Sequence, residues 1–303
     1  MDLNQLRTFV TVAEEKHLTR AAERLFTSQP AISAQLKALE ESLDVKLFDR
    51  TPKGMVLTPF GRQLLSHAEK TLSAADSMLV EAKSIKGQVI GDLRVGVNSD
   101  FPFLRIPQLM VSSQANYPGM QLSLESSMSA EIIVDIRKGK LDSGYFFGPC
   151  VSADLSVTKL ADIKTVVVAP VEWAERLNNA NIEDLADLPW IYTTASCPFY
   201  LLKEEIFRDS TKSPKKTVFV DTEDGIRELV KAGSGISLLR EDDADKAEAE
   251  GWGVRWSGSC PSVPLNIAVQ KNRVHEPLIL AWLDELRKCW GIASHDESAL
   301  DAI

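Results

Sequence analysis

Apolar residues recur at helical spacing in two runs between His17 and Leu43, and a short polar stretch separates the runs. The first run is Leu18, Ala21, Ala22 and Leu25, and the second is Ile32, Leu36, Leu39 and Leu43. Between them, Thr27 and Ser28 are residue types that cap the start of a helix, and Pro30 suits the first turn, where its missing N–H is no loss. The pattern predicts a helix, a tight turn and a second, longer helix.

The face of the second helix opposite its leucines carries Gln29, Ser33, Ala34 and Lys37. A helix with such groups can enter the major groove of DNA, where amides read adenine, hydroxyls read several bases and lysine pairs with phosphate. The alternative is an ordinary helical hairpin whose polar face is merely solvated.

The residues that follow predict a wing. Two short strands are expected at 48–50 and 55–58, around a turn rich in proline and glycine at 51–54. Arg50 and Lys53 are then placed to meet the phosphate backbone, which favours DNA binding over a solvated hairpin.

Pro59 opens a long helical pattern that reaches about Lys86. Leucine and alanine alternate along it at steps of three and four residues, at Leu65, Ala68, Leu72, Ala75, Leu79 and Ala82. This heptad predicts a helix that pairs with a second copy through the row Leu65, Leu72 and Leu79, and the alanine row lets the backbones approach. The alternative is a helix that packs on its own domain, which normally shows a wider apolar stripe.

From Asp92 onward, strand and helix patterns alternate. Strands are predicted at 93–97, 121–125, 144–147, 164–169, 190–193, 218–220, 235–239, 254–256 and 265–269, and helices at 104–116, 129–138, 173–177, 199–208, 223–232 and 277–289. This alternation predicts an α/β architecture with mostly parallel sheets. We expect two sublobes with chain crossings near 160–164 and 259–265, and a loose tail over 294–303.

Charge is distributed unevenly along the 303 residues, whose formal net charge is −9. The first ninety residues hold 12 Lys+Arg and 11 Asp+Glu, and the remainder holds 22 and 32. Because the DNA-binding domain is near neutral, it must contact DNA through a local basic edge, and dimerisation must double the number of phosphate contacts. That edge comprises Arg20, Arg24, Lys37, Arg50 and Lys53.

Composition also argues against several classes. The sequence contains no run of about 18 apolar residues, so no membrane span is predicted, and no signal peptide is recognisable. A cytoplasmic protein is therefore expected. The four cysteines lack metal-like spacing and should be free thiols, the four histidines are scattered, and neither a metal nor a cofactor is expected. Since there is no nucleophile elbow, phosphate loop or paired-carboxylate pattern, we do not expect an enzyme.

The segment 1–65 resembles the amino-terminal winged helix-turn-helix of LysR-type transcriptional regulators. The matching elements are Ala21-Ala22, Ser28-Gln29-Pro30-Ala31-Ile32-Ser33, Leu39-Glu40, Leu47-Phe48, Arg50 and Leu57-Thr58-Pro59 with Gly61. Asp44 stands where the family usually has glycine, and Phe60 where it usually has a small residue. Looser matches follow at 130–142 and 230–239.

The resemblance implies an α/β fold preceded, at the amino terminus, by an all-α winged helix-turn-helix domain. It implies a DNA-binding domain at 1–58 with the helix-turn-helix near 18–37, a dimerising linker helix at 59–87, and an effector domain at 91–295 built like periplasmic solute-binding proteins from two Rossmann-like sublobes. Sublobe I would take 91–161 and 266–295, and sublobe II 162–265. The DNA-binding residues would be Thr27, Ser28, Gln29, Pro30, Ser33, Lys37, Arg50 and Lys53. Such a protein binds double-stranded DNA as a homodimer or homotetramer, with RNA polymerase as a further partner.

Ligands of such sheets bind beyond the carboxyl ends of the strands, near helix N-termini. Three loops meet this description, and their residues are Asn98, Ser99, Asp100, Met128, Ser129, Thr193, Thr194 and Cys197. In the family, hydroxyls that contact the effector lie at positions matching Ser99 and Ser129 and in the loop 194–197. The alternative is that these hydroxyls only cap helices. Asp100 makes a simple dianionic effector less suitable.

Cys197 precedes a predicted helix, whose dipole should stabilise the thiolate and lower its pKa. The peroxide-sensing branch of the LysR family carries a reactive cysteine in a similar loop. That branch pairs it with a second cysteine shortly afterwards, whereas none lies between Cys197 and Cys260 here. A pocket-lining thiol is therefore preferred over a redox sensor, which stays open as an alternative.

These features predict a sequence-specific DNA-binding transcriptional regulator that is controlled by a small molecule held between two sublobes. The alternative from another class is a cytoplasmic ligand-binding protein, or an enzyme, that carries an accessory helical domain.

Overall fold

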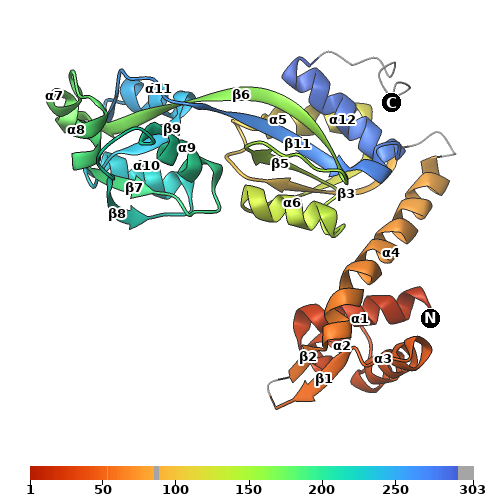
Figure 1. Ribbon diagram of the computed structural model, residues 1–303. Coiled ribbons are helices and arrows are strands. Elements are labelled where there is room, and N and C mark those ends of the chain that lie inside the picture. Colours follow the sequence, from red (N-terminus) through yellow and green to blue (C-terminus); the bar gives the residue numbers. More distant parts are fainter. Residues whose placement is uncertain (53, 85–88, 293–303) are drawn as a thin grey trace.

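The amino-terminal domain consists of three short helices and a two-stranded wing (Figure 1). Its elements are α1 (Leu3–Glu15), α2 (Leu18–Arg24), α3 (Gln29–Leu43), β1 (Phe48–Thr51) and β2 (Gly54–Leu57). The structure is a computed structural model that describes residues 1–52, 54–84 and 89–292. Helix α3 begins where the sequence predicts, because Ser28 accepts a hydrogen bond from the Ala31 N–H at 3.4 Å and Pro30 occupies the first turn. The helix-turn-helix and the wing are thereby confirmed.

The core of this domain forms where the helices meet the wing. Ala21 and Ala22 are buried, so α2 lies close to its neighbours, as the paired alanines predict. The rings of Phe9 and Phe48 pack edge to face with centroids 5.6 Å apart. The carboxylate of Glu40 accepts a hydrogen bond from the Phe48 N–H at 3.3 Å, which holds the first wing strand against α3.

The two departures from the family pattern are accommodated locally. Asp44 ends α3 in the left-handed conformation, at φ 53°, which glycine adopts more readily. Phe60 lies in the first turn of the next helix with 57 % of its surface exposed, so it displaces nothing in the core.

Helix α4 (Pro59–Ser84) leads away from this domain as a single long element (Figure 1). Ala68 is buried, and Leu65 and Leu72 are half-buried against the amino-terminal core. The lower part of the predicted dimerisation row is thus used within the chain, in line with the alternative interpretation of this helix. Further along α4, Met78 is 70 % exposed. The side chain of Leu79, the expected end of the helix at 85–86 and the tail over 294–303 lie outside the described residues.

The remainder of the chain is a two-lobed α/β domain. Its strands are β3 (Ile90–Val97), β4 (Gly119–Ser126), β5 (Ser143–Phe147), β6 (Leu155–Pro170), β7 (Pro189–Tyr192), β8 (Lys215–Phe219), β9 (Ser237–Arg240), β10 (Gly253–Arg255) and β11 (Ser262–Gln270). Its helices are α5 (Ile106–Asn116), α6 (Ser129–Arg137), α7 (Ala174–Leu177), α8 (Ile182–Asp187), α9 (Pro198–Ile206), α10 (Glu223–Lys231), α11 (Glu241–Ala249) and α12 (Pro277–Trp290). Two 3₁₀ turns, η1 (Val171–Trp173) and η2 (Lys271–Arg273), complete it.

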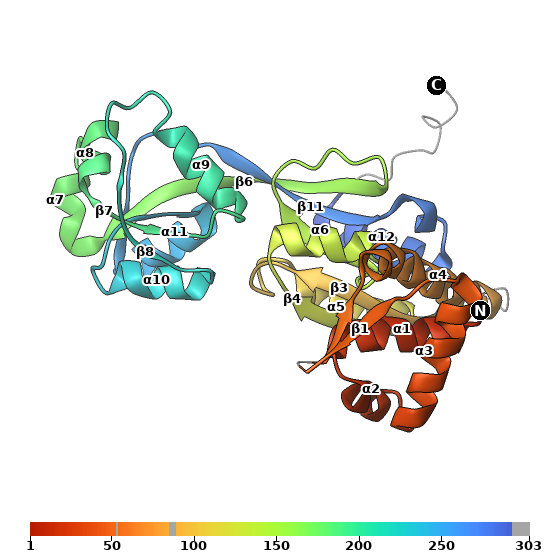
Figure 2. The same ribbon diagram turned by 60° about the horizontal axis from the view of Figure 1, so that its bottom comes forward.

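Strands β6 and β11 join the two sublobes (Figures 1 and 2). They pair antiparallel along their length, and the Ile163–Val263 pair lies where the sequence predicts the crossings. Within the sublobes β3 pairs parallel with β4 and β5, and β7 pairs parallel with β8. All ladders of β6 and β11 are antiparallel, so the expectation of mostly parallel sheets is wrong. The reason is that β6 leads from sublobe I to sublobe II and β11 leads back, so β11 runs opposite to β6 and to β5 on its other side.

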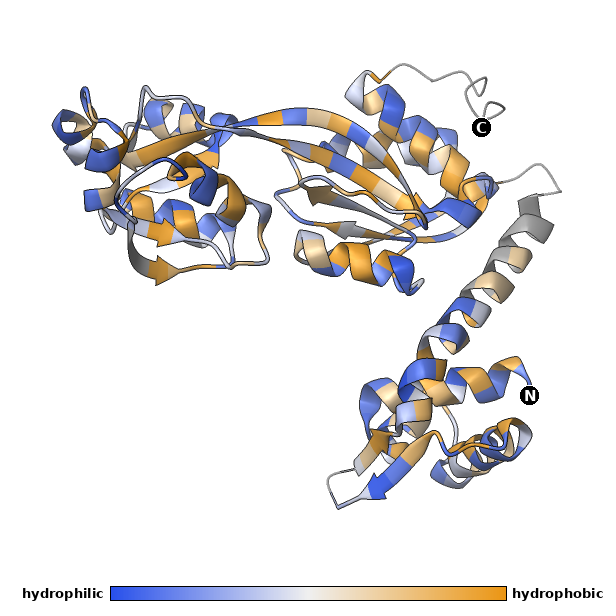
Figure 3. Cartoon of the chain, viewed as in Figure 1, coloured by the Kyte–Doolittle hydropathy of each residue, from blue (hydrophilic) through white to orange (hydrophobic). Residues whose placement is uncertain are grey.

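Helices cover both faces of the sheet in sublobe I. Helices α5 and α12 pack on one face, where Trp282 is fully buried and its Nε1 donates a hydrogen bond to Ser143 at 3.1 Å. Helix α6 packs on the other face through Ile132 and Ile136. In Figure 3 both α6 and α12 mix hydrophobic and hydrophilic positions, as expected of helices with one face on a sheet. The sequence analysis missed α8, which is short, and α11, whose residues are mostly charged.

A buried carboxylate ties the strands of sublobe I to the segment before α12. The side chain of Asp142 is only 6 % exposed; it accepts hydrogen bonds from the Arg94 N–H at 2.8 Å and from Arg273 Nη1 at 2.7 Å. Burial by itself raises the pKa of Asp142, but the hydrogen bonds and charges of the two arginines outweigh it and lower the pKa below its ordinary value.

We therefore expect Asp142→Asn to lower the free energy of unfolding by about 2 kcal/mol at neutral pH, because it removes the carboxylate that Arg94 and Arg273 share, while Arg273 keeps its pair with Glu276 at 2.8 Å. Since the folded pKa is depressed, this contribution is complete above the unfolded pKa of about 3.9 and is lost as the pH falls through the folded pKa. Urea unfolding at neutral and acidic pH measures it. A difference between wild type and variant that stays constant into acid would contradict the assignment.

Candidate functional site

The predicted DNA-binding residues gather on one side of the amino-terminal domain. Thr27, Ser28, Gln29, Pro30 and Lys37 are exposed on α3 or directly before it, and Ser33 is partly exposed. Arg50 reaches over from β1, and its Nη2 lies 3.0 Å from the Ser33 Oγ. Lys53 lies outside the described residues. The wing and the exposed face of α3 therefore form one continuous polar surface.

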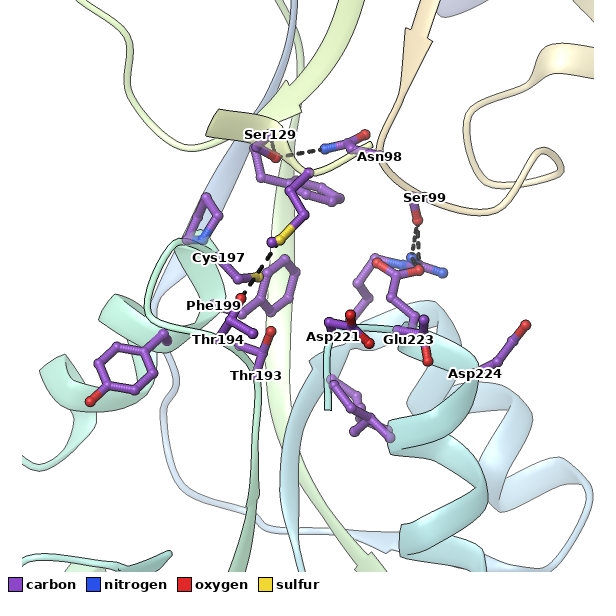
Figure 4. Close-up of a pocket in the computed structure, with 18 of the residues that line it drawn as sticks. Asn98, Ser99, Ser129, Thr193, Thr194, Cys197, Phe199, Asp221, Glu223 and Asp224 are labelled. Atoms are coloured by element: carbon purple, nitrogen blue, oxygen red, sulfur yellow. Dashed lines mark hydrogen bonds and ion pairs between the residues drawn. The ribbon is translucent and has the colours of Figure 1, made fainter. Parts of the chain in front are cut away.

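A second candidate site is a cleft of about 640 Å³ between the two sublobes. All eight predicted effector residues line it, from loops that follow β3, β4 and β7 (Figure 4). These residues are Asn98, Ser99, Asp100, Met128, Ser129, Thr193, Thr194 and Cys197. A cleft of this size suits a small metabolite.

On the sublobe I wall, Ser129 is the first residue of α6 and is buried. Its Oγ accepts hydrogen bonds from Asn98 Nδ2 at 3.0 Å and from the Phe147 N–H at 3.1 Å. The residue before it, Met128, makes no side-chain cap of the helix. The interpretation of Ser129 as a simple cap is therefore wrong, and its own O–H remains available as a donor.

On the opposite wall, the loop after β7 reaches across the cleft. Thr194 Oγ1 lies 3.7 Å and Ser196 Oγ 3.6 Å from the sulfur of Met128, so this loop touches sublobe I directly. Thr193 and Cys197 line the cleft from the same loop (Figure 4).

The most buried charge in the cleft, which the sequence analysis missed, is Arg240 at the end of β9. Its side chain is 1 % exposed and forms ion pairs with four carboxylates at 2.6 to 3.0 Å. They are Asp100, Glu223, Asp242 and Asp243. Because Asp100 belongs to sublobe I and the other three to sublobe II, Arg240 connects the sublobes.

The serine beside Asp100 belongs to the same cluster. Ser99 Oγ donates a hydrogen bond to Glu223 Oε2 at 2.7 Å and accepts one from Arg240. The guanidinium of Arg240 also stacks over the ring of Phe103, 3.9 Å from its centroid. Ser99 and Asp100 therefore contribute to the contact between the sublobes as well as to the wall of the cleft.

The cluster shifts the pKa values of its members in opposite directions. Burial works to lower the pKa of Arg240, but Glu223, Asp242 and Asp243 outweigh it and raise the pKa. Burial raises the pKa of Glu223, and the nearby guanidinium offsets this only in part. Burial also acts to raise the pKa of Asp100, but hydrogen bonds from the Phe103 N–H and Arg240 outweigh it and lower the pKa. The guanidinium is thus charged whenever the protein is folded.

The rule that located the eight predicted residues also applies to the residues that it missed. Arg240 ends β9, and the acidic run from Asp221 to Asp224 follows β8, so both lie at carboxyl ends of strands. These two segments differ from the predicted loops in that mainly charged side chains, rather than hydroxyls, line the cleft there.

The expectation for Cys197 is wrong. Burial raises the pKa of this thiol, and the hydrogen bonds from Thr193 and from the backbone of Phe199 do not compensate for it. The helix start therefore does not produce a stable thiolate at neutral pH.

Comparisons with known proteins agree with this geometry. The family described as "Bacterial regulatory helix-turn-helix protein, lysR family" matches residues 3–62, and "LysR substrate binding domain" matches residues 86–290. The uncharacterized transcriptional regulator YnfL of Escherichia coli is 30 % identical over 79 % of this chain and 82 % of its own length. The uncharacterized regulator YwqM of Bacillus subtilis is 28 % identical over 95 % of this chain and 99 % of its own.

Among solved structures, full-length OxyR from Pseudomonas aeruginosa, in a variant form, superposes with a TM-score of 0.72 at 29 % identity. The match covers 95 % of each chain. The likeness therefore extends over the amino-terminal domain, the long helix and both sublobes.

The raised pKa of Cys197 predicts slow alkylation by iodoacetamide at neutral pH, with a rate that rises only through and above the ordinary thiol range. The same cysteine in the urea-unfolded chain serves as the control, because its pKa is then unperturbed. Mass spectrometry of the peptide that contains Cys197 gives both rates. A folded-state rate that has already reached its plateau below neutral pH would restore the redox interpretation.

Proposed function

This chain belongs to the LysR family and is a DNA-binding transcriptional regulator of that type, and from this premise we propose that a small molecule held between its two sublobes controls it. The observation that carries the proposal is that eight residues from loops far apart in the sequence line one cleft. A ligand that touches both walls changes the free energy of their separation, and thereby favours one arrangement of the chain over another.

For DNA, we propose that Gln29 and Ser33 read base edges and that Arg50, Lys53 and Lys37 hold phosphates. Gln29 is exposed at the first position of α3, the end of a recognition helix that normally meets the bases. Lys37 lies farther along α3, with 77 % of its side chain exposed. The near-neutral charge of this domain favours binding by more than one copy.

Helix α4 is the element that we propose for pairing two copies, as a homodimer or within a homotetramer. Its exposed Met78 supports a partner on the upper half of the helix, since Leu65 and Leu72 are already partly covered by their own domain. A regulator of this kind works in the cytoplasm, where RNA polymerase is a further partner. No helix among the described residues is long and apolar enough to cross a membrane.

For the effector, we propose a polar group seated at the start of α6. The Ser129 hydroxyl and the uncapped N–H groups of this nine-residue helix favour a carboxylate or a similar oxyanion there. Asp100, which from the sequence makes a simple dianionic effector less suitable, is paired with Arg240 at 2.7 Å. We propose that another acidic residue of the cleft binds a hydrogen-bond donor of the effector.

Two alternatives give different outcomes. Thiol-based sensing through Cys197 is disfavoured because the pKa of the thiol is raised. A ligand-binding protein with an accessory helical domain would bind no specific DNA, so a gel shift with the DNA that flanks its own gene separates it from a regulator.

In that gel shift, Gln29→Ala should weaken the specific complex by about 1–3 kcal/mol and leave random DNA almost unaffected, because it removes a base contact. Lys37→Gln is the matched phosphate variant. It should weaken specific and random DNA alike and reduce the slope of log affinity against log salt by about one. Equal losses on both DNAs for Gln29→Ala would remove α3 from base reading.

In a transcription reporter, Ser129→Ala should abolish the response to the effector and leave operator binding intact, since this residue lies in the cleft. The variant also loses two hydrogen bonds, so its free energy of unfolding should fall by about 1 kcal/mol for each. Ser234→Ala, at an exposed turn of sublobe II, is the control. An unchanged response in Ser129→Ala would place the effector elsewhere.

A further inference from the structure

The charged side chains that line the cleft are mostly acidic. The carboxylates are Asp100, Glu131, Asp221, Glu223, Asp224 and Asp243, and the cations are Lys203, Arg227 and Arg240. A ligand that enters this space therefore meets more negative than positive charge. Whether the cleft can bind an anion depends on whether any of its cations lacks an ion-pair partner.

Each of the three cations already has its counter-charge. Arg240 pairs with four carboxylates. Arg227 pairs with Asp224 and, at 3.0 Å, with Asp243. Lys203 is 4 % exposed, pairs with Glu204 at 2.8 Å, and lies against the rings of two tyrosines. Among the described residues that line the cleft, no cation is left to neutralise an anionic ligand.

Two carboxylates of the cleft have no cation beside them among the described side chains. Glu131, in the first turn of α6, accepts a hydrogen bond from the Ser127 hydroxyl at 2.6 Å, and Asp221 is the other. Asp221 follows β8 and is exposed, and it has no hydrogen-bond or ion-pair partner among the described side chains, which do not include those of residues 215–217. Figure 4 shows it on the sublobe II side of the cleft, across from Ser129 on sublobe I. A cation held there would lie between the sublobes and would be only partly screened by water.

A second, independent acceptor lies on the opposite wall. The side-chain oxygen of Asn98 is buried and has no hydrogen-bond partner in the described part of the chain, while its amide nitrogen donates to Ser129. A buried acceptor without a donor costs free energy, so an N–H or O–H from a bound molecule or a water would stabilise this wall.

We propose that the effector carries a protonated amine, which Asp221 holds, and that small aminocarboxylates are the preferred class. The inference rests on the proposed effector cleft, in which the start of α6 takes the carboxylate. With every cation already paired, a dicarboxylate would gain no ion pair and would be repelled by Asp221, whereas an ammonium group gains one.

The test uses four probes of equal chain length on the full chain, at millimolar concentration. They are 5-aminopentanoate, 1,5-diaminopentane, glutarate and 1,5-pentanediol. Since a ligand that binds only the folded state raises the melting temperature, we expect the largest shift with 5-aminopentanoate, a smaller one with the diamine, and none with glutarate or the diol. A glutarate shift that equals or exceeds that of 5-aminopentanoate overturns the proposal, and so does the absence of any shift with both amines.

Variants of Asp221 then locate the amine. Asp221→Asn should weaken 5-aminopentanoate binding about fivefold, as expected for one partly screened ion pair, and Asp221→Lys should make glutarate the better ligand. Because this side chain is exposed, both variants should fold. Asp209→Asn, which removes an exposed carboxylate outside the cleft, should bind like wild type. Unchanged amine affinity in Asp221→Asn overturns the assignment of this residue.

Operator binding by the same proteins distinguishes a failure of the amine proposal from a failure of the proposed regulator function. Intact operator binding with glutarate as the preferred ligand refutes the amine and leaves the regulator in place. Loss of specific DNA binding in the wild-type chain refutes the proposed function itself.

Discussion

A guanidinium that is almost wholly buried must be neutralised where it lies, and at Arg240 this requirement brings the two sublobes together. Three of its four carboxylates come from its own sublobe, but Asp100 and the hydroxyl of Ser99 come from the other. Removing one partner would leave charge in a poorly solvated place, which costs far more than an exposed pair would gain. Ser99, Asp100 and Glu223 are consequently fixed in position, and they bound the cleft on one side.

The rest of the cleft is free to respond because the other connections are of a different kind. Strands β6 and β11 carry the chain across and can bend without losing their mutual hydrogen bonds. The loop after β7 touches Met128 only through weak contacts between hydroxyls and sulfur. The sublobes are thus joined by a strong contact at Arg240 on one side of the cleft and by weak contacts at Met128 on the other.

Much of this arrangement could be predicted from the sequence, because it depends on local signals. The Ser28 cap, the wing turn and the strand-end loops each follow from a few adjacent residues, and the structure brings all eight predicted effector residues to one cleft. Strand direction is not a local property, so the antiparallel ladders of β6 and β11 could not be predicted. Neither could the cluster at Arg240, whose contact with Asp100 joins residues 140 positions apart. Cys197 shows the same limit, since the helix start is visible in the sequence and the burial that outweighs it is not.

The placement of α6 gives the cleft a short route to the DNA-binding domain. The helix begins at Ser129 in the cleft and spans nine residues, roughly 13 Å. Just past its end, Lys140 lies 3.7 Å from Glu14 of α1, and Figures 1 and 2 both show the amino-terminal domain beside sublobe I and away from sublobe II. A helix packed against a sheet moves as a unit, so a displacement at its first turn reaches its last turn. Helix α6 therefore connects the cleft wall at Ser129 to the ion pair between Lys140 and Glu14, which is partly exposed and weak.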